Sequence, residues 1–167
     1  MTVILRHANG SRATLLLDGE PLPALIGAAG TRRDKSEGDM ATPLGFLPFR
    51  HVFYRADRVA RPVTVLRTEA LSPDDGWCDD PAHPDYNRQI TLPHPARHER
   101  LWREDHCYDL CVVLGWNDSP AVPGRGSAIF LHLPPTSGAT EGCIALEERL
   151  LRRIIASGHA GIEVRPD

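Results

Sequence analysis

Residues 127–140 read Ser-Ala-Ile-Phe-Leu-His-Leu-Pro-Pro-Thr-Ser-Gly-Ala-Thr, and residues 141–146 read Glu-Gly-Cys-Ile-Ala-Leu. The apolar run at 127–133 predicts a strand, and the Pro- and Gly-containing run at 134–140 predicts a loop that folds the chain back. An amphipathic helix is expected over residues 146–156, with acids near its start and Ser157-Gly158 at its end. The stretch therefore indicates a mainly β domain with a terminal helix.

The rest of the chain fits the same fold class. Fifteen prolines and fourteen glycines leave few windows long enough for a helix, so short strands and turns should dominate, with a few short helices. A turn is expected at Asp18-Gly19, a polar loop over 31–42, and a long loop over 70–95, a length that is usually functional or mobile. Further strands are expected over residues 14–17, 22–26, 46–54 and 109–114.

The bulk composition limits the function classes. A length of 167 residues fits a single domain over residues 1–167, with no sign of a second core. The formal net charge of −3 gives no support to nucleic-acid binding, and no apolar run is long enough for a membrane span. The first residues lack the features of a signal peptide, so the chain as written is expected to stay in the cytoplasm.

Cys143 is the best candidate for a reactive group. Gly142 before it allows a tight turn and a close approach of substrate, and the helix expected just after it would favour thiolate over thiol. His132, at the end of the predicted strand, is the candidate base. The alternative is that Cys143 is a buried, inert residue and His132 a structural group.

Other cysteines and histidines give weaker signals. Cys107 and Cys111 are four residues apart without a second ligand pair, so they are expected to be small core residues. His94 and His98 have the spacing of a helical metal pair, but Pro95 between them argues against a regular helix. We therefore expect neither a metal nor a cofactor.

Two separate motifs resemble the YkuD-type L,D-transpeptidase family. In that family a strand histidine precedes a Ser/Thr-His-Gly-Cys sequence, and here the matching positions are His132, Thr140, Gly142 and Cys143. Far upstream, residues 38–46 resemble the Thr-Pro-x-Gly turn of the same family. The resemblance spans roughly residues 20–158 and implies a β-sandwich or barrel with a C-terminal helix after the catalytic cysteine.

Within the family, three segments look most like a compact proteobacterial branch that is associated with 1,3-type cross-links, in which a first-position L-Ala is joined to diaminopimelate. These segments are residues 76–80, 85–88 and 124–127. The chain also departs from the family pattern. Glu141 replaces the usual histidine, Ala145 replaces the usual arginine and Leu133 replaces a frequent glycine, so the way the substrate is held should differ.

The resemblance implies roles for four residues. Cys143 would attack the carbonyl of a peptidoglycan stem peptide and carry it as a thioester, and His132 would activate the thiol. The Leu133 carbonyl would orient the imidazole, and the N–H groups of Gly142 and Cys143 would stabilise the oxyanion. The same acyl-enzyme also allows hydrolysis, as in an L,D-carboxypeptidase, an endopeptidase or an amidase, and a non-catalytic wall-binding module is a third reading.

Substrate-binding residues are harder to select from sequence. Arg125 suits the carboxylates of a diaminopimelate stem, or is a solvated turn arginine. Glu141 is expected to point away from the sulfur and to hold an amine, or to form an ion pair with Arg125 or another base. The remaining candidates, each with a structural alternative, are Tyr54, Trp77, Asp80, Tyr86, Asn87, Ser127 and Thr140.

The expected partners are peptidoglycan stem peptides, one as acyl donor and one supplying the diaminopimelate amine as acceptor. This substrate lies outside the cytoplasmic membrane, so the resemblance implies a periplasmic or cell-wall location, although no signal peptide is visible. Carbapenems, which acylate the cysteine of this family, are expected to label Cys143. Oligomeric state stays open.

Overall fold

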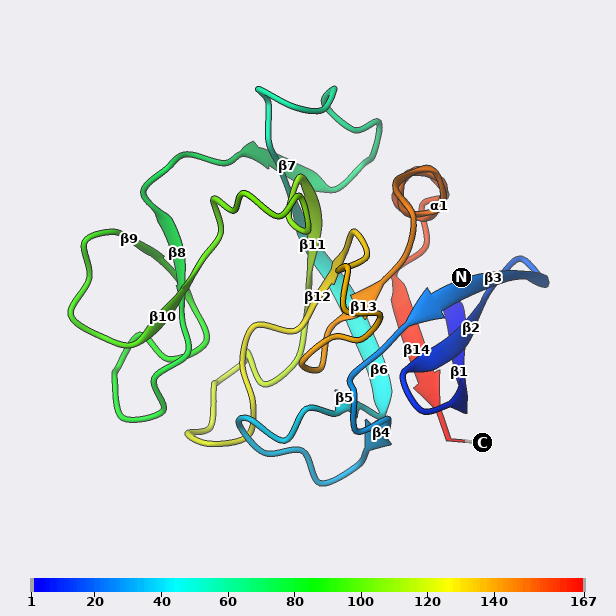
Figure 1. Ribbon diagram of the computed structural model, residues 1–167, viewed down its shortest axis with the longest axis horizontal. Helices are drawn as coiled ribbons and strands as arrows, with labels where there is room; N and C mark the ends of the chain where they lie inside the picture. Colours follow the sequence, from blue (N-terminus) through cyan, green and yellow to red (C-terminus); the bar gives the residue numbers. More distant parts are fainter. Residues whose placement is uncertain (1, 167) are drawn as a thin grey trace.

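The computed structural model describes residues 2–166 and has a mainly β architecture with one helix near the C-terminus (Figure 1). Eight strands pair in the order β11-β12-β13-β3-β2-β1-β14-β6, and β6 pairs in turn with β11, which closes the ring. The ring strands are β1 (Val3–Asn9), β2 (Arg12–Leu17), β3 (Glu20–Leu25), β6 (Gly45–Tyr54), β11 (Leu110–Leu114), β12 (Phe130–His132), β13 (Ile144–Ala145) and β14 (Gly161–Arg165). The expected mainly β fold is confirmed.

The blue β1–β3 meander and the red β14 lie together on one side of the ring (Figure 1). The expected turn is present between β2 and β3, where Asp18 and Gly19 both have positive φ, as a tight hairpin requires. β1 and β14 were not predicted. They pair in parallel, with Val3 opposite Ile162, so the two ends of the described chain complete the ring.

The strands β11, β12 and β13 carry apolar side chains on both faces. Leu131 and Ile144 are opposite each other and join the large core inside the ring. Side chains alternate along a strand, so Phe130 and Cys143 face the other way and join a second apolar cluster. The expectation of a single core was therefore too simple, because β11–β13 are buried on both faces.

A small three-stranded sheet covers the second face. Its strands are β8 (Asp75–Cys78), β9 (Gln89–Thr91) and β10 (His98–Arg100), and it lies on the opposite side of Figure 1 from β1–β3. The expectation of a loop over residues 70–95 is corrected, because β8 and β9 fall inside that range and carry apolar side chains of their own. A further strand, β7 (Arg67–Ala70), runs parallel to β6.

The helix α1 is Glu148–Ala156, shorter at its start than the predicted 146–156. Its expected apolar stripe is confirmed, because Leu151, Ile154 and Ile155 are buried against the ring core. The short strand β13 separates Cys143 from the helix, so the expected helix N-terminus beside the thiol is wrong. Between residues 2 and 166, no helix has the length and apolar character that a membrane crossing needs.

The segment over residues 31–42 is mainly loop, as expected, but two short strands, β4 (Thr31–Arg32) and β5 (Thr42–Pro43), pair at its ends. The segment between them is therefore a loop whose two ends are held together by the β4–β5 pair. It lies at the end of the ring near β6, in the lower part of Figure 1.

Candidate active site

Cys143 lies immediately before β13 and is 8% exposed. Its Sγ accepts a hydrogen bond from the Phe130 N–H at 3.3 Å and donates to the Ala128 carbonyl at 3.2 Å. Burial, reinforced by the charge of Glu99, raises the pKa of Cys143 to about 12. The resting group is therefore a thiol, and forming the thiolate requires a base and a favourable charge nearby.

His132 ends β12, two residues after Phe130 and hence on the same face as Cys143. Its Nδ1 lies 2.7 Å from the Leu133 carbonyl oxygen. A carbonyl oxygen only accepts, so Nδ1 carries the proton and Nε2 carries the lone pair that a base needs. Burial lowers the pKa of His132 to about 4, which keeps the imidazole neutral near pH 7.

Two threonines hold the loop that carries Cys143. Thr140 Oγ1 donates to the Cys143 carbonyl at 2.6 Å and accepts from the Gly142 N–H at 3.2 Å. Thr42 Oγ1 donates to the Gly142 carbonyl at 2.9 Å and accepts from the Gly27 N–H at 3.0 Å. The upstream Thr-Pro-x-Gly motif thus contacts the nucleophile loop directly.

Cys143 and His132 line one cavity of about 410 Å³, whose wall is about half polar and carries several charged side chains. Five carboxylates and two cations contribute to it, so the lining is acidic in balance. The carboxylates are Glu37, Asp79, Glu99, Asp105 and Glu141, and the cations are Lys35 and Arg103. This wall suits a ligand that carries an amino group.

A polar network from β10 and the following loop supports the imidazole. The Tyr108 ring packs edge-on against the ring of His132, with centroids 5.1 Å apart. Its hydroxyl donates to Glu99 Oε1 at 2.5 Å, and Arg103 Nη1 lies 3.4 Å from the same oxygen. Burial raises the pKa of Glu99, so this carboxyl resists ionisation more than a surface glutamate does.

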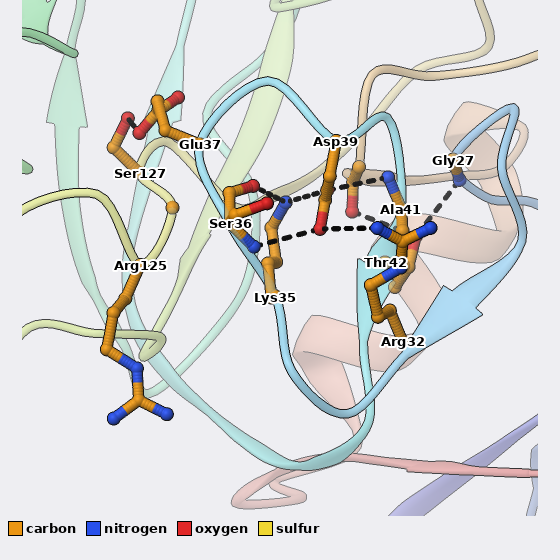
Figure 2. Close-up of polar contacts among 12 residues, drawn as sticks. Gly27, Arg32, Lys35, Ser36, Glu37, Asp39, Ala41, Thr42, Arg125 and Ser127 are labelled. Atoms are coloured by element: carbon orange, nitrogen blue, oxygen red, sulfur yellow. Dashed lines mark hydrogen bonds and ion pairs between the residues drawn. The ribbon is translucent and has the colours of Figure 1, made fainter.

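Arg125 and Glu141 differ from expectation. Arg125 is exposed, lies outside the cavity wall and points away from Lys35 and Ser127 (Figure 2). Glu141 is exposed and lines the cavity, and its charge contributes to the raised pKa of Cys143. Among residues 2–166 no ion pair joins Glu141 to Arg125, which the sequence had allowed.

Trp77 and Asn87 lie behind the cavity. Trp77 packs edge-on against Phe130, and its Nε1 donates to Asn87 Oδ1 at 3.0 Å. The amide of Asn87 also accepts from the Ala128 N–H and donates to two backbone carbonyls, those of Trp116 and Asn117. Both residues support β12 and the segment before it, and both lie outside the cavity lining.

Four further candidates have mixed positions. Ser127 lines the cavity and donates to Glu37 Oε2 at 2.9 Å, and the Tyr86 hydroxyl makes a short hydrogen bond to the same oxygen (Figure 2 shows the Ser127 contact). Asp80 accepts from the Ala82 N–H in a turn outside the cavity. Tyr54, on β6, packs against the ring core and lies outside the cavity.

The histidine pair considered for metal binding does not come together. His94 lies beside His83 and Asp85, with His94 Nε2 3.3 Å from Asp85 Oδ2. The Nδ1 atoms of His83 and His94 accept backbone N–H groups from Asp85 and Ala96, which occupies one lone pair of each ring. Cys107 and Cys111 are buried, unpaired core residues, as expected.

Sequence reasoning missed several residues of this site. Lys35, Glu99, Arg103 and Tyr108 all line the cavity with Cys143. Nothing in their local sequence marks them, because their positions on the cavity wall follow from tertiary packing. The available signal for Lys35 was its position four residues before Asp39, next to the Thr-Pro-x-Gly motif.

A β ring with a buried cysteine and histidine on one polar cavity defines the class of cysteine-dependent acyl-transfer catalytic domains. The profile of the YkuD family, the L,D-transpeptidase catalytic domain, matches residues 5–156, which is most of the chain. The protein therefore belongs to this family, whose members act on peptidoglycan. No curated protein matches the chain.

Proposed function

We propose that the protein is an L,D-transpeptidase that forms peptidoglycan cross-links of the 1,3 type through a Cys143 thioester. The observation that carries the proposal is the His132 ring, fixed by the Leu133 carbonyl, beside Cys143 on one cavity of a YkuD-family domain. The proposal places the site in the periplasm or cell wall, where peptidoglycan lies.

The reaction divides into two acyl transfers. His132 Nε2 takes the proton from Cys143, and the sulfur attacks the carbonyl carbon of an L-centre in the donor stem. The C–N bond then breaks, and the leaving amine takes the proton back from His132. The diaminopimelate amine of the acceptor stem then attacks the thioester carbonyl and loses a proton to His132. The C–S bond breaks, and the released thiolate takes that proton from His132, which regenerates the thiol.

The oxyanion donor in this proposal is the Cys143 N–H. The N–H of Gly142, named above as a candidate, already donates to Thr140 Oγ1. A preorganised donor at the developing oxyanion contributes about 2.7–4 kcal/mol to such reactions. Thr140 and Thr42 hold the backbone in place for this donor.

Two features favour the 1,3-type cross-link. Ala145, where the family has an arginine, is fully buried in β13 between β12 and β3, so no side chain from this position can reach a donor carboxylate. The acidic balance of the cavity wall suits the ammonium of the acceptor better than an anionic donor group.

The test is incubation with purified tri- and tetrapeptide muropeptides, followed by mass spectrometry. Wild type should give dimers with an L-Ala–diaminopimelate bond, and Cys143→Ala should give none. Shortened monomers without dimers would indicate hydrolysis instead. Dimers formed by Cys143→Ala would contradict the proposal. No product and no carbapenem adduct with wild type would also contradict it and would favour a non-catalytic wall-binding module.

A further inference from the structure

Lys35 is a buried cation at the active site. Its side chain is 3% exposed, yet its residue lines the cavity that contains Cys143. A buried charge is costly unless it is paired, and a buried ion pair is weak evidence of a stabilising role. The position of this ammonium next to the nucleophile therefore needs a functional explanation.

A triad of charges fixes Lys35 in place (Figure 2). Its Nζ lies 2.7 Å from Asp39 Oδ1, and the other oxygen of Asp39 lies 3.9 Å from Arg32 Nη1. Asp39 also accepts the N–H groups of Ser36 and Ala41. Two cations share one carboxylate, so the triad carries a net positive charge, and Lys35 is the member that faces the cavity.

Two glycines leave room for this side chain. A Cβ at residue 126 would lie 2.9 Å from Lys35 Cε, and φ of Gly126 is +95°, which disfavours other residues. A Cβ at residue 142 would lie 3.5 Å from Lys35 Nζ, so the ammonium is next to the residue before the nucleophile. The loop that carries Cys143 thus packs directly against the lysine head group.

The other charges around Cys143 are mostly unfavourable to a thiolate. Glu99 from β10 and Glu141 from the nucleophile loop both raise the pKa of Cys143, whereas Lys35 lowers it. Arg103 is held by Asp105 and Glu99. The other titratable groups of the wall are Glu37, Asp79, Cys107, Tyr108 and His132, with Cys111 in the cluster behind.

We propose that Lys35 is an electrostatic positioning residue, which stabilises the negative charge that develops on Cys143 Sγ when His132 removes its proton. The inference rests on the proposed function, in which Cys143 is the nucleophile. Lys35 thus supplies a positive charge near the thiolate. Neither the start of α1, which is separated from Cys143 by β13, nor residue 141, where Glu replaces the usual histidine, supplies one in this chain. Asp39 and Arg32 act by holding the ammonium in position.

The experiment measures alkylation of Cys143 by iodoacetamide as a function of pH, resolved from the other cysteines by peptide mass spectrometry. The probe is neutral, so Lys35 does not attract it. An opposite charge within about 4–6 Å shifts a pKa by roughly one unit or more. Lys35→Met should therefore displace the rate profile by about one pH unit to higher pH. Near pH 7 the rate should fall about 3–10-fold, because a more basic thiolate is also more nucleophilic.

Lys35→Arg, which keeps the charge, should stay within about threefold of wild type. Arg33→Met is the matched control, because Arg33 is an exposed cation of the same loop outside the cavity wall, and it should leave the profile unchanged. Lys35→Gln serves if Lys35→Met does not fold. It keeps a polar head group that can donate to Asp39 but removes the charge, and it should displace the profile to higher pH as Lys35→Met does.

A wild-type profile for Lys35→Met or Lys35→Gln, or equal losses for Lys35→Met and Lys35→Arg, would overturn the inference. These outcomes are distinct from failure of the proposed function. If Cys143 of wild type is not alkylated at all, the nucleophile assignment fails. If it is alkylated without any influence of Lys35, the inference about the lysine alone fails.

Discussion

At the scale of single residues, Thr42 links two parts of the chain that are about a hundred positions apart. Its hydroxyl bonds Gly27 and Gly142, and the residue is fully buried. The sequence identified the Thr-Pro-x-Gly motif by resemblance and assigned Thr42 no role. The structure supplies one, since the motif positions the backbone beside the nucleophile.

Replacing Thr42 tests that role. Thr42→Val leaves the Gly27 N–H and the Gly142 carbonyl without their partner, each at about 1–3 kcal/mol, so the free energy of unfolding should fall by about 2–6 kcal/mol. Thr42→Ser keeps the hydroxyl and loses one buried methyl group, at about 1 kcal/mol. Urea unfolding measures both, and equal losses would contradict the bracing role.

His132 makes stability depend on pH. Its pKa is about 4 in the folded protein against 6.5 as the ordinary value, so the unfolded chain binds the proton more readily. The stability it contributes is fully present above about pH 6.5, falls as pH decreases towards about 4, and is constant below that. The stability lost between these two pH values totals about 3 kcal/mol.

Urea unfolding of wild type and His132→Asn across this pH range isolates the contribution, because other groups such as Glu99 titrate in both proteins. The difference in unfolding free energy between the two should shrink as pH falls. A difference that stays constant across the range would mean that the imidazole is not desolvated as described.

At the scale of elements, alternation along β12 and β13 decides which side chains meet. The pairing of Leu131 with Ile144 sends both into the ring and leaves Phe130, His132 and Cys143 on the other face. Strands such as β2, β6 and β11 and the helix stripe were predictable, because both follow from local periodicity. The start of α1 was not, because Leu146 fits the apolar stripe by spacing while its N–H bonds the His132 carbonyl, which continues the strand pairing of β13.

The cavity wall was the least predictable part of the site. The cysteine and histidine roles follow from motifs, whereas Lys35, Glu99 and Tyr108 reach the cavity only through the packing of distant segments. Conversely, Trp77 and Asn87 looked like binding residues because they lie in a polar, aromatic stretch. They are buried supports, because the stretch folds into strands β8 and β9 rather than a loop.

At the scale of the whole molecule, β14 completes the ring by pairing with both β1 and β6. Ile162 on this strand is fully buried in the ring core, whereas its neighbour Glu163 faces outward and is half-buried. The ring therefore depends on a strand that follows the catalytic residues in sequence.

Paired substitutions in β14 measure this dependence. Ile162→Ala should lower the free energy of unfolding by about 2–5 kcal/mol, as expected for truncating a core isoleucine. Glu163→Ala truncates a side chain at the neighbouring outward position and should cost less than about 1 kcal/mol. Comparable losses in chemical unfolding would show that β14 is not an integral core strand.

The parallel pair of β1 and β14 also determines the order in which the chain can fold. Val3 finds Ile162 only after nearly the whole chain has been synthesised, and such distant pairings slow folding through the entropy of closing the loop. The thiol of Cys143 is thus made before the strand that closes the ring. Until then the ring core, to which β14 contributes Ile162 and Val164, stays open to solvent, and its apolar side chains are available for wrong contacts.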